Sequence, residues 1–143
     1  LNCQWVPAGS YPSKTITLSP LADGWLGITA SPDFLNIATC TGTDAGRIRM
    51  SSDSGFTWTV KTSVGKKWRG ITSTPDFTKL AATVIGTAPA VGDYIYFSTD
   101  GGNTWKLTSG EGSGFPTGNG VGRIGLCVYP KNPQIVYAVA GRS

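Results

Sequence analysis

Two motifs recur in the same order along this chain, and their spacing constrains the fold more than any other feature. The segment 25–34 returns 43 residues later as 68–77, with seven of ten positions identical. The segment 51–58 returns 47 residues later as 98–105. A unit of about 40–50 residues is the size of one four-stranded blade of a β-propeller. The repeat therefore predicts an all-β propeller.

Each unit predicts four short antiparallel strands, which we name A to D. With 20 glycines, 9 prolines and only 14% charged residues, the composition suits short strands joined by tight turns. The expected strands in the two full units are A at 25–31 and 68–74, B at 35–41 and 79–85, C at 46–51 and 93–98, and D at 57–62 and 104–109.

Partial units flank the two full ones. Residues 125–130 align with 27–32, and 134–140 then predict a strand B. Gln4 and Trp5 align with Thr57 and Trp58, so 4–8 predict strand D of a preceding blade. About four blades are needed to close a ring, so we expect an open arc completed by blades of the same or neighbouring chains. The expected division of this single propeller domain, 1–143, is a partial blade 1–8, blades 25–62 and 68–109, and a partial blade 122–140, about 2.75 blades in all.

The second motif predicts a structural C–D turn. Asp53 can accept backbone N–H groups of the turn that follows, Gly55 can take the positive φ of a tight hairpin, and Trp58 is expected to be largely buried against its own blade. Two copies at matching points of two blades indicate scaffold, because an active site is rarely duplicated. The residues assigned to these turns are Ser51, Asp53, Gly55, Thr57, Trp58, Ser98, Asp100, Gly102, Thr104 and Trp105.

These turn residues resemble a known motif. Segments 51–58 and 98–105 match the Asp-box, or bacterial neuraminidase repeat, of sialidases, sortilin-type receptors and xyloglucanase-type glycoside hydrolases. Segments 115–118 and 122–138 look like a blade start of sortilin-like and xyloglucanase-like propellers. The resemblance implies an Asp-box propeller. Because the boxes of such families lie at the periphery, away from ligand, it carries no family site residue onto this chain.

The residue types present exclude several kinds of site. There is no histidine, which removes His-based triads and His zinc ligands. The cysteines Cys3, Cys40 and Cys127 have irregular spacing, which gives no disulfide framework and no metal pattern. Cys3 opens an expected D strand, Cys40 ends a B strand and Cys127 lies within an A strand of a later blade, so we expect no disulfide between any two of them. Cys40 and Cys127 fall on expected strands, so we expect buried free thiols. No metal ligand, cofactor or catalytic constellation is predicted within the chain.

A glycosidase would need two opposed carboxylates. Most acids here occupy matching points of the two units, which leaves Asp23 and Glu111 without a counterpart. They could face one another only across the central channel, and the glycines and serines around Glu111 favour a solvated side chain. A sialidase would need a cluster of arginines for the substrate carboxylate and a tyrosine nucleophile, and the arginines of this chain show no matching motif. The chain therefore leans away from catalysis, although other blades could supply such groups.

The strongest candidate for binding is one face of the propeller. B–C loops and D–A connections share this face and differ in length between units, whereas the turns of the other face repeat; variable loops on a rigid scaffold are the usual place for binding. Trp25 and Trp68 are expected to serve blade packing. The candidate ligand-binding residues are Asp44, Arg47, Lys66, Lys67, Arg69, Asp93 and Glu111.

These features favour a non-catalytic propeller module that binds protein or glycan through this face, within a larger extracellular or secretory-pathway protein. The alternatives are a portion of a xyloglucanase- or sialidase-like glycoside hydrolase, and a structural subunit of a cell-surface assembly. The net charge of +4 is modest and scattered, which does not predict nucleic-acid binding. No apolar run has the length of a membrane span.

Overall fold

A computed structural model describes residues 24–62, 65–86, 94–109, 112–116, 120–132 and 134–142. The strand expected at 4–8 lies outside these residues, as do Cys3, Asp23, Asp93 and Glu111. Every regular element of the described residues is a β-strand, and each strand pairs antiparallel with its neighbours.

The strands form three sheets. Blade 1 contains β1 (Trp25–Ala30), β2 (Ile37–Thr41), β3 (Ile48–Ser51) and β4 (Thr59–Val60) in that order. Blade 2 repeats the order with β5 (Trp68–Ser73), β6 (Leu80–Val84), β7 (Tyr94–Ser98) and β8 (Lys106–Leu107). The third sheet, blade 3, pairs β9 (Val121–Val128) with β10 (Val136–Arg142). These sheets confirm the propeller fold predicted from the repeat.

The D strands are shorter than expected. Both β4 and β8 have two residues, because the two residues expected before each belong to the C–D turn and the two expected after each lie beyond the strand. The two blades share the same strand register. Ile37 lies opposite Ser51 in blade 1, and Leu80 lies opposite Ser98 at the equivalent place in blade 2. In β1 and β5 the register shifts directly after the single tryptophan of the strand, Trp25 or Trp68.

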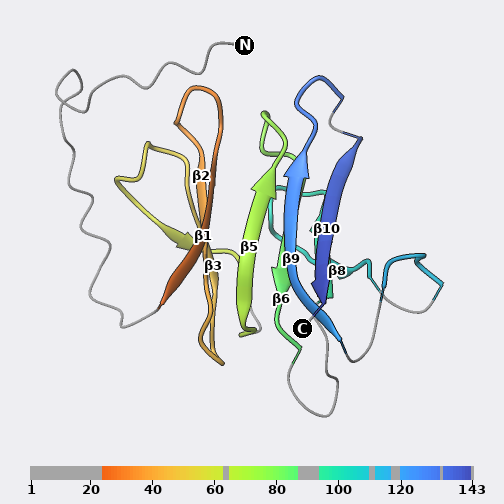
Figure 1. Ribbon diagram of the computed structural model, residues 1–143. Coiled ribbons are helices and arrows are strands. Elements are labelled where there is room, and N and C mark those ends of the chain that lie inside the picture. The colour runs from red at the N-terminus through yellow and green to blue at the C-terminus, as the bar shows by residue number, and fades with distance from the viewer. Residues whose placement is uncertain are drawn as a thin grey trace, which may run out of the picture.

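The three A strands lie side by side, with β5 between β1 and β9 (Figure 1). The turns β1–β2, β5–β6 and β9–β10 all lie at the top of this view, on one face of the arc. In an antiparallel sheet alternate connections lie at opposite ends, so the B–C loops and D–A connections share the other face.

The core of the described residues is the junction of blades 1 and 2. Blade 1 contributes Ala38, Cys40, Ile48 and Met50, all buried. The facing side of blade 2 contributes Trp68, Ile71, Phe77, Leu80, Ala82 and Val84. The inner strands approach closely here, since a Cβ on Gly27 would lie 3.1 Å from the Cα of Gly70.

The A–B turns place a phenylalanine in a left-handed conformation that the sequence does not predict. Phe34 has φ of 58° and Phe77 has φ of 57°. Aspartate side chains hold these turns, because Asp33 accepts from the backbone N–H of Leu35 at 3.0 Å and Asp76 from that of Thr78 at 3.1 Å. Phe77 is only 5% exposed and joins the core, whereas Phe34 is 67% exposed.

The structure corrects the expectation for one cysteine. Cys40 and Cys127 are both free thiols, and Cys40 is buried as expected. Cys127 is exposed. It lies on β9 opposite Tyr137 of β10, on a side of blade 3 where none of the described sheets packs.

Candidate functional site

The C–D turns are organised by their aspartates. Asp53 accepts hydrogen bonds from the Thr57 backbone N–H at 2.9 Å, the Thr57 hydroxyl at 2.6 Å and the Ser51 hydroxyl at 2.7 Å. Asp100 repeats these contacts with Thr104 and Ser98. Gly55 and Gly102 have φ of 85° and 82°, as the hairpin requires.

The turn tryptophans are partly buried. The indole N–H of Trp58 donates to the Gly55 carbonyl at 3.1 Å, and that of Trp105 to the Gly102 carbonyl at 3.0 Å. These bonds hold each ring close to its turn, and both side chains are intermediate in exposure. Trp105 still packs against its own blade, with its ring centroid 5.5 Å from that of Trp68.

Hydrogen bonding keeps the turn carboxylates ionised. The Thr57 side chain first, then the backbone N–H of Thr57 and the Ser51 side chain, lower the pKa of Asp53 to about 2. Thr104 and Ser98 do the same for Asp100. The pKa values of Asp33 and Asp76 are also lowered, chiefly by Ser31 and Thr74. A general acid of a glycosidase needs a raised pKa, so none of these four carboxylates suits that role.

The predicted binding face contains a groove at the junction of blades 1 and 2. We call it the face groove; it encloses about 230 Å³. Asp44 of the first B–C loop and Lys67 of the D–A connection form an ion pair there, 2.8 Å between Oδ1 and Nζ. The residues that line it are Asp44, Gly65, Lys66, Lys67, Val84, Ile85, Gly86, Tyr94 and Tyr96.

The structure thus brings together three of the predicted residues, Asp44, Lys66 and Lys67. Arg47 and Arg69 do not line the face groove. A Cβ added to Gly65 would lie 2.6 Å from Nη1 of Arg47, which places that guanidinium against the D–A connection. Asp93 and Glu111 lie outside the described residues.

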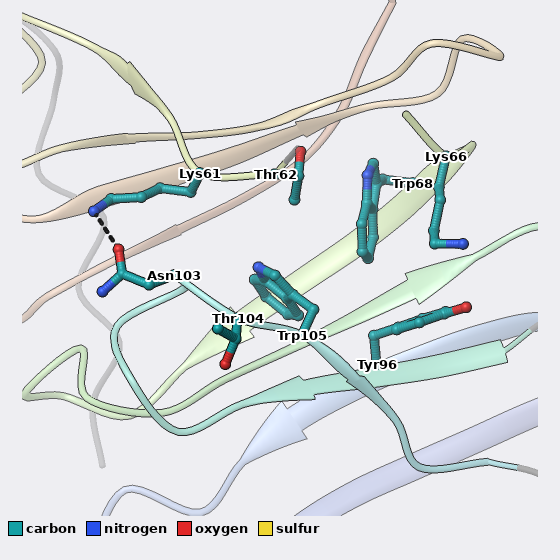
Figure 2. Close-up of a pocket in the computed structure, with 8 residues that line it drawn as sticks. All are labelled: Lys61, Thr62, Lys66, Trp68, Tyr96, Asn103, Thr104 and Trp105. Atoms are coloured by element: carbon teal, nitrogen blue, oxygen red, sulfur yellow. Dashed lines mark hydrogen bonds between the residues drawn. The ribbon is translucent and has the colours of Figure 1, made fainter. Parts of the chain in front are cut away.

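A second hollow adjoins the face groove. This peripheral pocket encloses about 260 Å³ between the end of blade 1 and the outer strands of blade 2. Figure 2 shows Lys61 and Lys66 on either side of Trp105, with Trp68 and Tyr96 beside it. Lys66 and Tyr96 line both hollows. The Nζ of Lys66 lies 5.0 Å from the centroid of the Tyr96 ring, within cation–π range.

Sequence reasoning missed Tyr94, Tyr96, Lys61 and Asn103. A signal for the tyrosines exists in the register, because Tyr96 of blade 2 occupies the position of Arg49 in blade 1. Comparing the two C strands position by position would have identified Tyr94 and Tyr96 as departures from the repeat. Lys61 and Asn103 meet across the blade junction, so only the packing of the blades reveals them.

No group of His, Cys, Asp and Glu side chains suited to hold a metal ion occurs among the described residues. The same part of the chain contains no long apolar helix of the kind that crosses a membrane.

Comparison with solved structures shows the fold. The chain is similar to a GH74 xyloglucanase from Xanthomonas campestris, with a TM-score of 0.65 and 15% identity over 90% of this chain and 21% of that enzyme. It is also similar to a GH74 enzyme from Niastella koreensis, with a TM-score of 0.51 and 20% identity over 82% of this chain and 19% of that enzyme. The chain therefore spans about a fifth of either enzyme. No family model matches it, and no curated protein is similar to it.

Proposed function

We propose that these blades belong to a β-propeller that binds a glycan in the face groove. The observation that carries the proposal is the gathering of Asp44, Lys66, Lys67, Tyr94 and Tyr96 at one blade junction. Tyrosine rings offer apolar planes to the C–H faces of sugars, while the charged groups can hydrogen-bond sugar hydroxyls. This combination of apolar wall and few polar groups is usual in small-molecule sites.

The fold neighbours support a glycan over a protein as ligand. One of the two similar structures is a xyloglucanase, an enzyme that acts on a polysaccharide. With an extracellular polysaccharide as the ligand, the proposal places the protein in an extracellular or secretory-pathway setting. The chemistry of the groove does not require catalysis there.

Binding measurements on the whole chain test the proposal. We expect titration calorimetry or affinity electrophoresis to detect at least one polysaccharide or its oligosaccharides, xyloglucan included. Tyr94→Ala should weaken that binding roughly tenfold, as loss of a stacking ring typically does. Tyr129→Ala is the matched control, because Tyr129 is exposed in the β9–β10 turn on the other face. Equal loss in both variants, or no glycan bound by the parent chain, would contradict the proposal.

A second candidate function is a portion of a glycoside hydrolase, which the two GH74 neighbours favour. The four turn carboxylates are unsuited as general acids, and Asp44 is already paired with Lys67. A catalytic pair would therefore have to come from residues outside those described. Release of reducing sugar from xyloglucan, lost on Asp23→Asn or Glu111→Gln, would favour this candidate.

A further inference from the structure

The peripheral pocket has a positive charge that no described carboxylate neutralises. Asp44 is paired with Lys67, and Asp33, Asp53, Asp76 and Asp100 accept hydrogen bonds within their own turns. Neither Lys61 nor Lys66 forms an ion pair with any of these groups. A hollow with ammonium groups and no counterion among the described residues is suited to an anionic ligand.

One of these ammonium groups is held in place before any ligand arrives. Lys61 donates from Nζ to Oδ1 of Asn103 at 2.9 Å, across the blade junction (Figure 2). Asn103 is itself fixed, because its Nδ2 donates to the Asp100 carbonyl at 2.6 Å. An ammonium has three donors, so Lys61 keeps donors for a ligand. Ordering its side chain in advance lowers the entropic cost of binding.

The wall of the pocket is aromatic. Trp68 packs its ring against Tyr96 and Trp105, at centroid distances of 5.6 and 5.5 Å. The indole N–H of Trp68 is buried without an acceptor among the described residues, and such groups are rare in native structures. Apolar planes flanked by cations and an amide match a sugar ring that carries an acidic group better than they match a bare anion.

The two hollows are adjacent, because Lys66 and Tyr96 line both. A ligand longer than one sugar can therefore run from the face groove past Lys66 toward Lys61. We propose that the peripheral pocket is a subsite for an acidic glycan, in which Lys61 and Lys66 bind carboxylate or sulfate groups and Trp105 and Tyr96 contact the sugar rings. This inference rests on the glycan binding proposed above and adds the charge of the ligand.

The test compares three oligosaccharides of equal length on the whole chain: an oligogalacturonate, a sulfated oligosaccharide and a neutral cello-oligosaccharide. We expect at least one acidic probe to bind roughly tenfold or more tightly than the neutral one in low salt, with the advantage falling as salt rises. Preference for the carboxylated or the sulfated probe identifies the acidic group.

Variants of single lysines make the test specific. Lys61→Gln should weaken binding of the acidic probe roughly tenfold and leave the affinity for the neutral probe unchanged. Lys106→Gln is the matched control, since Lys106 is exposed on β8 and lines neither the face groove nor the peripheral pocket; it should change the binding of neither probe. Melting temperatures of both variants should match the parent, because neither lysine is buried.

The outcomes separate this inference from the proposed function. Neutral and acidic probes bound equally, with no effect of Lys61→Gln, would overturn the acidic subsite and leave glycan binding intact. Absence of binding to every glycan would overturn both. A polyglutamate peptide bound as tightly as the oligogalacturonate, with the same loss on Lys61→Gln, would replace the sugar with an acidic peptide and overturn the subsite as proposed.

Discussion

A single carboxylate organises each C–D turn. Asp100 accepts the backbone N–H and the hydroxyl of Thr104 together with the hydroxyl of Ser98, while Ser98 Oγ in turn accepts from the Gly102 N–H at 2.9 Å. One ionised side chain therefore fixes the path of the whole loop. The turn residues could be identified from the sequence because these bonds are local and need only the motif itself.

The depressed pKa of the turn carboxylates predicts loss of stability in acid. Folding lowers the pKa of Asp100 from 3.8 to about 2, so its contribution is present above pH 4 and is lost as the pH falls toward 2. We expect Asp100→Asn to lower the melting temperature at pH 7 by roughly 5 °C and to flatten its fall between pH 4 and 2. Thermal melts followed by circular dichroism measure both effects.

The control for this prediction is Asp44→Asn, which removes a surface ion pair that contributes little to stability. Its melting temperature should stay close to that of the parent at pH 7. An Asp100→Asn variant that melts as the parent does across this pH range would show that the carboxylate does not hold the turn.

At the scale of the strands and turns, equivalent positions of blades 1 and 2 differ in whether a neighbouring blade covers them. Phe34 and Phe77 have the same place in their A–B turns and nearly the same φ, but only Phe77 packs against a neighbouring blade. The repeat predicted both turns and the order and approximate place of the A, B and C strands, since these follow from local pattern, but it made both D strands too long. It could not predict the two hollows, which depend on blade-to-blade packing and on positions, such as Arg49 and Tyr96, where the units differ.

Comparing alanine substitutions at these two phenylalanines shows how much the blade junction contributes to stability. Phe77→Ala removes a buried ring from the core and should lower the free energy of unfolding by about 3–4 kcal/mol. Phe34→Ala makes the same chemical change at a 67% exposed side chain and should cost roughly 0.5 kcal/mol or less. Urea unfolding of both variants gives the comparison. Similar losses would mean that Phe34 is also covered in the folded protein.

At the scale of the molecule, the outer faces of blades 1 and 3 carry apolar side chains at the positions that are buried between blades 1 and 2. Ile28 of blade 1 is 70% exposed, whereas Ile71, its counterpart in blade 2, is 8% exposed. Val139 of blade 3 is 73% exposed, whereas its counterpart Cys40 in blade 1 is fully buried. Both outer faces therefore present the apolar side chains that the internal junction buries, and we expect each to accept a further sheet of a propeller.

The reactivity of the two described cysteines can show which of these surfaces are covered in the folded protein. Burial at the junction raises the pKa of the Cys40 thiol to about 12, so it holds little of the reactive thiolate at pH 8. Cys127 lies on the open side of β9. With iodoacetamide and mass spectrometry of the native chain, we expect Cys127 to be alkylated many times faster than Cys40, and Cys40 to react only on unfolding. Protection of Cys127 until denaturation would show that another sheet covers blade 3. Rapid alkylation of Cys40 would mean that the junction of blades 1 and 2 opens, and that the face groove and the peripheral pocket, which both lie at that junction, are not rigid sites.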